Sequence, residues 1–198
     1  MFLDESGFTR VSALKRTWAP VGQTPMVKTS ISKKGRINLI GSLAQPLKRA
    51  ARPRRATFIV SPGWRTIRLS LGMHRHTVTG NEINMALKQL LKIINGPIVL
   101  IWDQHSIHRH PMNKELIAKQ SGPLRGHGRL HVFELPAAAP ELNPAEGLWS
   151  QIDEYLAGTA PKTIDELAIN VRNGAMRTRN NKTRLWACLA QSELPWDV

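Results

Sequence analysis

Residues 79–103, TGNEINMALKQLLKIINGPIVLIWD, decide the fold because a helical pattern passes there directly into a buried strand. Thr79 is placed to cap the predicted helix, and Gly96 to close it. The apolar residues between them recur at helical spacing, at Ile83, Met85, Ala86, Leu87, Leu90, Leu91 and Ile94. The run PIVLIW that follows is almost entirely apolar, which is typical of a strand buried on both faces of a sheet. A helix that crosses between buried strands predicts that those strands run parallel.

Strand patterns dominate the chain before this stretch. The opening residues MFLDESGF predict a short strand that runs into a turn at Gly7. Further runs are rich in β-branched residues or alternate between apolar and basic residues: GRINLIGSLAQ (35–45), RATFIVSPGW (55–64) and RTIRLSLGM (65–73). We therefore expect a group of antiparallel strands ahead of the helix.

Strand and helix alternate in the second half of the chain. MNKELIAKQ (112–120) predicts a helix and LHVFELP (130–136) a strand, and further helices are expected at 143–158, 163–180 and 182–192. Strands first, and then strand alternating with helix, predict an α/β domain built on a mixed sheet.

The composition limits the class of protein. A chain of 198 residues fits one domain of ordinary size, and 28 Lys and Arg against 14 Asp and Glu give a net charge of +14. Because the basic residues recur along the whole chain, a polyanion such as nucleic acid is the favoured partner. Cys188 is the single cysteine, which excludes an internal disulfide and a cysteine-rich zinc site. No apolar stretch approaches the length of a membrane span, so we expect a soluble protein of the cytoplasm without membrane contact.

Three acidic residues stand where a strand ends or a helix begins: Asp4 after FL, Asp103 after IVLIW, and Glu146 in NPAEGLW. If the first strand lies parallel to PIVLIW, Asp4 and Asp103 emerge at neighbouring strand ends. Adjacent carboxylates repel each other unless a cation lies between them, and hard oxygen ligands select Mg²⁺ or Mn²⁺. Each acid also has a structural interpretation. An Asp at a strand end often forms a turn, and Glu146 would complete a variant of the capping box with Asn143 and Pro144.

The blocks that contain these acids resemble a known family. FLDESGF, IVLIWDQHSIHRH and LPAAAPELNPAEGLWSQI look like the signature blocks of bacterial insertion-sequence transposases of the mariner-like DDE superfamily, in the same order and at comparable distances. The resemblance covers Asp4 to about Gln151, and PELNPAEGLW is its most specific part. It implies a ribonuclease H-like fold, with a mixed five-stranded sheet flanked by helices. By the match, Asp4, Asp103 and Glu146 correspond to the family's catalytic and metal-binding triad.

The resemblance also implies the chemistry. Two Mg²⁺ ions roughly 4 Å apart, with Mn²⁺ as a substitute, would support hydrolytic cleavage at transposon ends and attack of the freed 3′-hydroxyl on target DNA. Prolines at positions 136, 140 and 144 stiffen the loop before Glu146. We expect this stiffness to hold the helix start opposite the two aspartates.

The implied partner is double-stranded DNA, both as transposon ends and as target. Phosphate contacts are expected from basic clusters and from the block after Asp103, although each cluster could equally be a solvated surface: Lys33, Lys34, Arg36, Arg54, Arg55, His108, Arg109, Arg177 and Arg179. For His108 we expect hydrogen bonding or a phosphate contact, in preference to zinc binding. Trp102 and Trp149 are expected in the core, with base stacking reserved for an exposed tryptophan such as Trp64.

The resemblance divides the chain and leaves parts of the family's pattern unmatched. Residues 1–160 are expected to form the catalytic domain, and residues 161–198 a helical extension packed on it. The family's helix-turn-helix modules have no counterpart here, since three residues precede Asp4. An upstream helix-turn-helix polypeptide is therefore an expected partner. The resemblance also implies a second copy of the chain, because transposases of this type generally act in pairs. Gln104 replaces the usual Asn, AAA replaces an aromatic-Ser approach to PELNP, and SGPLRGHGR widens the interval from Asp103 to Glu146.

Two alternatives stay open beside an active transposase domain. The first is a catalytically inactive or domesticated DNA-binding derivative, which would bind DNA in a salt-sensitive way and cut none. The second is a structure-selective nuclease on the same fold, which would cut branched DNA without needing end sequences.

Overall fold

The fold is taken from a computed structural model that describes residues 1–11, 18–23, 26, 35–45, 67–122 and 128–194. The predicted strand at 55–64 lies outside these ranges, as do Trp64 and the basic residues Lys33, Lys34, Arg54 and Arg55. In the described part of the chain no helix is long and apolar enough to cross a membrane.

A mixed sheet forms the centre of the molecule, with the strand order β3-β2-β1-β4-β5. Its strands are β1 (Phe2–Thr9), β2 (Arg36–Ala44), β3 (Arg68–His74), β4 (Ile98–Trp102) and β5 (Leu130–Glu134). β1, β2 and β3 pair antiparallel, whereas β4 pairs parallel to β1 and β5 parallel to β4. The predicted mixed five-stranded sheet flanked by helices is therefore confirmed.

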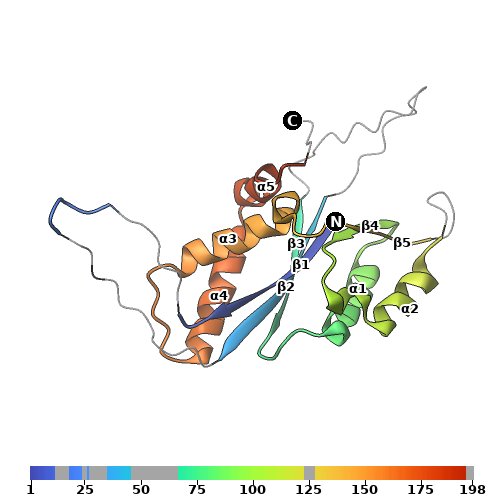
Figure 1. The fold of residues 1–198 in the computed structure, drawn as a ribbon, viewed down its shortest axis with the longest axis horizontal. Helices are drawn as coiled ribbons and strands as arrows, with labels where there is room; N and C mark the ends of the chain where they lie inside the picture. Colours follow the sequence, from blue (N-terminus) through green and yellow to red (C-terminus); the bar gives the residue numbers. More distant parts are fainter. Residues whose placement is uncertain (12–17, 24–25, 27–34, 46–66, 123–127, 195–198) are drawn as a thin grey trace, which may run out of the picture.

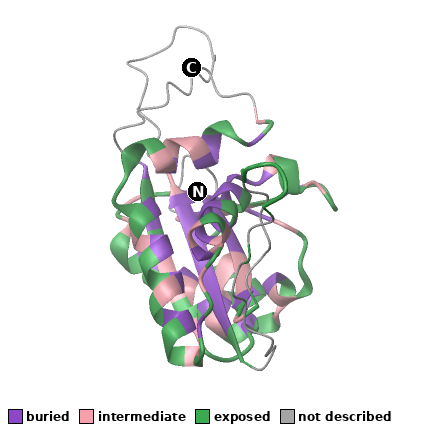
Figure 2. Ribbon diagram, turned by 90° about the vertical axis from the view of Figure 1, so that its left-hand side faces the viewer, coloured by how far each residue is buried: buried purple, intermediate pink, exposed green. Residues whose placement is uncertain are grey.

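Helices cover both faces of this sheet (Figure 1). α1 (Gly80–Ile93) and α2 (Pro111–Gln120) lie on one side, and α3 (Pro144–Leu156) and α4 (Ile164–Arg179) lie on the other. α5 (Lys182–Ala190) packs beside α3 at the end of the molecule where β1 begins. In Figure 2 the strands at the centre of the sheet are largely buried, while the outward faces of the helices are exposed.

The two layers of helices enclose two apolar clusters. One cluster joins β2 with α3, α4 and α5 and contains Leu39, Leu148, Val171 and Leu189. The other joins β4 with α1 and contains Leu3, Ile83, Leu87 and Leu100. Because α4 and α5 contribute to the same cluster as β2 and α3, the C-terminal helices are part of the packing that holds the sheet.

Residues 79–103 fold largely as their sequence pattern predicts. Thr79 caps α1, and it forms a reciprocal capping box in which its own N–H donates to Glu82 at 2.8 Å. The helix ends at Ile93, before the predicted Gly96, which instead turns the chain into β4 with a φ of +129°. β4 is fully buried on one face and partly buried on the other, so the expectation of complete burial on both faces is wrong.

Gly7 does not break the first strand, contrary to the sequence prediction. β1 continues to Thr9, and Gly7 pairs with Asn38 of the antiparallel neighbour. The side chain of Arg36 lies where a Cβ on Gly7 would stand. A missing side chain at this position therefore makes room for the arginine and permits a longer strand.

Candidate active site

Asp4 lies in β1 and faces α3. It is paired with Gly41 of β2, and its side chain is buried, with 7% of the residue exposed. Its Oδ1 accepts a hydrogen bond from Glu5 N at 2.8 Å, and its Oδ2 accepts from Asn143 Nδ2 at 3.0 Å and from Trp149 Nε1 at 2.9 Å. Since successive side chains of a strand point to opposite faces, Glu5 is directed toward the side of α1.

Asp103 follows the end of β4, the strand that pairs in parallel with β1 through Phe2 and Ile101. The expected neighbourhood of the first strand and PIVLIW is thus confirmed. Asp103 Oδ1 accepts a hydrogen bond from His105 N at 3.0 Å and lies 3.1 Å from His108 Nδ1. This is the turn-forming contact that an aspartate at a strand end offers, so the structural interpretation of Asp103 holds beside any functional one.

Glu146 lies in the first turn of α3, which Asn143 caps and Pro144 begins. The predicted capping box is incomplete, because Asn143 N–H donates to the carbonyl of Pro140 at 2.9 Å rather than to Glu146. Glu146 therefore does not accept a hydrogen bond from the backbone N–H of the capping residue Asn143. The positive end of the helix favours the ionised form of Glu146, and its burial and the charge of Asp103 oppose this effect.

The proline-rich loop before α3 is fastened to the end of β4. Leu135 N donates to the carbonyl of Trp102 at 2.7 Å, and Gln104 Nε2 donates to the carbonyl of Leu135 at 3.1 Å. Ala138 takes a left-handed conformation with a φ of 56°, which is strained for a residue with a side chain. The loop therefore carries the chain from the strand that presents Asp103 to the helix that presents Glu146 along a constrained path.

The three acids line one cavity of about 370 Å³. Most of its remaining lining is uncharged and comes from the loops after β4 and β5: Gln104, His105, Leu135, Pro136, Ala137, Ala138, Ala139, Pro140 and Asn143. Its charge is consequently dominated by carboxylates, in a chain whose net charge is +14.

Burial and mutual repulsion change the acidity of this cavity. Burial raises the pKa of Asp4 from 3.8 to about 7, and the nearby carboxylates of Glu5 and Glu146 raise it as well, against the lowering effect of the Trp149 and Glu5 N–H hydrogen bonds. Burial and the charge of Asp103 likewise raise the pKa of Glu146. Ionising either acid in this cavity therefore costs more than it does in water, and a nearby positive charge would offset that cost.

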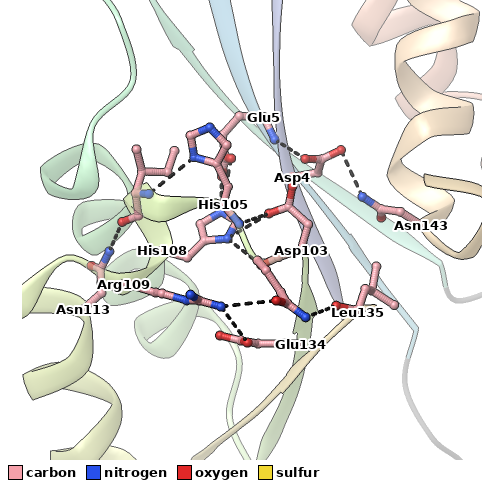
Figure 3. A network of polar contacts seen from close by, with 12 residues as sticks. Asp4, Glu5, Asp103, His105, His108, Arg109, Asn113, Glu134, Leu135 and Asn143 are labelled. Carbon is pink, nitrogen blue, oxygen red and sulfur yellow. Dashed lines mark hydrogen bonds and ion pairs between the residues drawn. The ribbon is translucent and has the colours of Figure 1, made fainter. Parts of the chain in front are cut away.

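The donor set fits a hard divalent cation, because all three side chains offer carboxylate oxygens and a cation would relieve the cost of ionising them. As they stand, no three His, Cys, Asp or Glu side chains within the described ranges are grouped closely enough to hold one metal ion. Asp4 is turned toward α3, as Figure 3 shows for Asp4 and Asn143. Binding by all three acids thus requires Asp4 to turn from Asn143 and Trp149 or to use Oδ1.

His108 lies behind the cavity, and its side chain is 1% exposed. Nε2 faces the carboxylate of Glu5 at 3.1 Å, and Nδ1 faces the carbonyl oxygen of Asp103 at 3.0 Å (Figure 3). Burial lowers the pKa of His108, but hydrogen bonding and charge from Glu5 and Asp103 outweigh this and raise it overall. The hydrogen-bonding role predicted for His108 agrees with these contacts, whereas a DNA phosphate cannot reach a side chain buried in this way.

The other basic residues named for DNA contact are exposed where the structure describes them. Arg36 begins β2, and Arg177 and Arg179 lie in the last turns of α4, where Arg177 sits 5.9 Å from the ring centre of Tyr155. Arg109 Nη2 lies 3.3 Å from Glu134 Oε2. Their role in DNA binding remains a prediction.

Sequence reasoning missed the contacts of three residues around the site: Asn143 and Trp149, which donate to Asp4, and Glu5, which contacts His108. Trp149 is buried, as predicted, but its ring N–H is also a polar contact of the site. A signal for it exists in the sequence, since a buried tryptophan N–H usually has an acceptor and Trp149 lies about one helical turn after Glu146.

Comparison with known proteins gives a family and a fold. The family model for the DDE superfamily endonuclease matches residues 45–168, a span that contains Asp103 and Glu146 and begins after β1. The solved structure of the Mos1 strand transfer complex is similar over 96% of this chain and 50% of that chain, with 12% identity and a TM-score of 0.60. The mariner Mos1 paired-end complex with Mn matches over 96% and 51%, with 11% identity and a TM-score of 0.61.

At these identities the likeness establishes the fold alone, which is ribonuclease H-like, as the resemblance implied. The chain spans about half the length of these Mos1 chains. Among curated protein sequences, none matches it.

Proposed function

Because the chain belongs to the DDE superfamily of endonucleases, we propose that it is the catalytic domain of a DNA transposase of the bacterial insertion-sequence type. Its reaction would be metal-dependent cleavage of DNA at the ends of the element, followed by transfer of the freed strand to target DNA. The observation that carries the proposal is the single cavity lined by Asp4, Asp103 and Glu146. Within this proposal, residues 1–160 form the catalytic domain and residues 161–198 a helical extension.

Asp4, Asp103 and Glu146 would hold the metal, Mg²⁺ or in its place Mn²⁺, as two ions. When bound, such ions supply Lewis-acid chemistry, in which they polarise phosphoryl oxygens and make a water or a hydroxyl group a better nucleophile. Support comes from the all-oxygen donor set and from the raised pKa of Asp4 and Glu146. Two of the similar structures are Mos1 paired-end complexes described with Mg and with Mn.

The protein's own residues would position the three acids and keep basic side chains out of the cavity. Before a cation binds, Asn143 joins the start of α3 to β1 through its bond to Asp4, which keeps Glu146 on the same side of the sheet as Asp4. The loop from Leu135 to Pro140 adds alanine and proline side chains to the cavity and no basic group. A phosphate would therefore be attracted into the cavity by cations held on the acids, and not by the lining itself.

DNA is the proposed substrate, with phosphate contacts outside the cavity. Support comes from the net charge of +14 and from the exposed Arg36, Arg109, Arg177 and Arg179. Lys33, Lys34, Arg54 and Arg55 complete the proposed contact set, although they lie outside the described residues. A second copy of the chain and an upstream helix-turn-helix polypeptide are the proposed protein partners, and the cytoplasm is the proposed compartment.

The proposal is tested by nicking of duplex DNA that carries the ends of the element, in the presence of Mg²⁺ or Mn²⁺. Asp103→Asn and Glu146→Gln should abolish cleavage while DNA affinity and the folded state persist. Glu141→Gln is the matched control, because Glu141 lies in the same loop region but does not line this cavity. Undiminished cleavage in either of the first two variants would reject the assignment.

The same assay separates the alternatives. Salt-sensitive DNA binding with no cleavage under any divalent metal would identify a non-catalytic derivative. Cleavage of branched DNA irrespective of the end sequence would identify a structure-selective nuclease.

A further inference from the structure

We propose that His108 is a positioning residue of this site, which fixes Asp103 through one ring nitrogen and Glu5 through the other and thereby sets the affinity for the cation. The inference deepens the proposed function and rests on it, since it assigns residues that hold a metal ligand without touching the metal. Glu5 and His108 do not line the cavity. They lie between the strand of Asp4 and the turn that follows Asp103 (Figure 3).

Both nitrogens of the His108 ring are engaged by these two acids. Nδ1 lies 3.0 Å from the carbonyl oxygen of Asp103 and 3.1 Å from its carboxylate Oδ1. Nε2 lies 3.1 Å from Oε1 and 3.2 Å from Oε2 of Glu5. One ring therefore links two carboxylates that come from segments 98 residues apart in the sequence, Glu5 and Asp103.

The ring itself has little freedom to move. It stacks on Trp102, with ring centres 4.3 Å apart and planes inclined by 5°. It belongs to a short 3-10 turn, Ser106–Arg109, which Asn113 holds by donating from Nδ2 to the carbonyl of Ile107 at 3.1 Å. A rigid ring transmits its position to the groups that bond to it.

The contact with Asp103 matters because that side chain is 46% exposed and would otherwise be free to turn into solvent. Oδ1 takes the contacts from His108 and from His105 N. This fixes the plane of the carboxylate and leaves Oδ2 for a cation. Removing a residue that orients a metal ligand in this manner typically lowers metal affinity or activity by about 10- to 100-fold.

The contact with Glu5 matters because it ties together the strands that present two of the acids. β1 and β4 pair at Phe2 and Ile101, two residues before Asp4 and Asp103 respectively. Beyond this pair, His108 supplies a link between the strand of Asp4 and the turn after Asp103. Glu5 points away from the cavity on the strand next to Asp4, and its side chain is 14% exposed, so its anchoring leaves Asp4 available.

Two isosteric variants separate the arms of this link. In His108→Asn the amide nitrogen stands near the position of Nδ1 and keeps the contact with Asp103, whereas in His108→Gln it stands near Nε2 and keeps the contact with Glu5. The readouts are Mn²⁺ binding to the full chain by calorimetry and the Mg²⁺ concentration for half-maximal DNA cleavage. We expect His108→Gln to weaken Mn²⁺ binding, and to raise the Mg²⁺ concentration for half-maximal cleavage, by about 10-fold or more. The changes in His108→Asn should be smaller. His76→Asn, which loses an exposed contact with Glu82, should leave both unchanged.

Glu5 provides a second, independent arm. Glu5→Gln removes the charge but keeps an acceptor for Nε2, and Glu5→Ala removes both. If anchoring is what matters, Mn²⁺ binding is weaker in Glu5→Ala than in Glu5→Gln, and adding His108→Gln to Glu5→Ala costs less than the sum of the two single losses. If His108→Gln fails to fold, as judged by circular dichroism, the comparison of Mn²⁺ binding between Glu5→Ala and Glu5→Gln tests the proposal.

The inference is overturned if folded His108→Gln, or Glu5→Ala compared with Glu5→Gln, binds Mn²⁺ as tightly as its reference. Failure of the proposed function has a different signature, because the unaltered chain would then neither bind Mn²⁺ in the cavity nor cleave DNA.

Discussion

Trp149 donates its ring N–H to the carboxylate of Asp4 at 2.9 Å, across 145 residues of the sequence. The contact joins α3 to the central strand of the sheet inside the protein. Asn143, which caps the same helix, donates to the same oxygen at 3.0 Å. One carboxylate thus fastens to the sheet the helix that carries Glu146, and the same carboxylate belongs to the proposed site.

We predict that Trp149→Phe destabilises the protein by about 1–3 kcal/mol, because it removes a donor from a buried carboxylate while it preserves most of the apolar ring. Equilibrium unfolding in urea measures the loss. The effect should shrink in an Asp4→Ala background, where the hydrogen bond is already absent. Equal losses in both backgrounds would mean that Trp149 acts through packing alone.

The metal-free protein should become less stable relative to Asp4→Asn as the pH rises from about 4 to about 7. Burial raises the pKa of Asp4 from 3.8 to about 7, so in this window the folded chain holds a proton that the unfolded chain has lost. The unfolding free energy that depends on Asp4 then falls with a slope of up to roughly 1.4 kcal/mol per pH unit. Urea unfolding with a chelator, across this range, measures the gap. A gap that does not change with pH contradicts the burial of an ionisable Asp4.

Gly41 makes room for the ring of Trp149 opposite Asp4. A Cβ at Gly41 would stand 2.7 Å from Trp149 Cη2 and 3.0 Å from Leu148 Cδ2. We therefore expect Gly41→Ala to cost about 1–3 kcal/mol through overpacking. Gly72→Ala in β3 is the control, since its closest neighbour is a histidine ring atom at 3.3 Å. Equal stability of the two variants in thermal unfolding would refute the close approach.

Arg177 and Arg179 are expected to bind DNA phosphates from the exposed end of α4. The double variant Arg177→Ala with Arg179→Ala should lower DNA affinity about equally for all sequences, and it should reduce the salt dependence by about one unit of slope per lost contact. Titrations at several salt concentrations measure both quantities. Lys119→Ala breaks the exposed pair with Glu115 on α2 and is the control for the loss of one positive charge elsewhere on the surface. Equal salt slopes in the double variant and the unaltered chain would exclude these arginines from the interface.

Local signals in the sequence sufficed for most of the fold. Thr79 with the periodic residues after it predicts α1, and the apolar run PIVLIW predicts the parallel strand that brings Asp103 beside Asp4. These predictions succeed because periodicity and capping depend on residues within a few positions of each other. The prediction of a turn at Gly7 was wrong because it also used only nearby residues. The space beside Gly7 is filled by Arg36, which comes from another strand.

The partners of the acids could not be predicted in this way. The bonds from Asn143 and Trp149 to Asp4, and from His108 to Glu5, span 103 to 145 residues, and no local pattern encodes which buried groups meet. Composition indicates only that a buried Trp N–H or His ring usually has a partner. The predicted capping role of Glu146 failed because the carbonyl of Pro140 takes the N–H of Asn143, a contact set by the conformation of the loop.

The central claim is that Asp4, Asp103 and Glu146 share divalent cations, and a crystal structure with Mn²⁺ tests it most directly through anomalous scattering. We predict anomalous peaks in the cavity, with Oδ2 of Asp103 and a carboxylate oxygen of Glu146 as ligands and with Asp4 turned from Trp149 or coordinating through Oδ1. A cavity free of anomalous signal at saturating Mn²⁺, with Asp4 still bonded to Trp149 and Asn143, would contradict the claim.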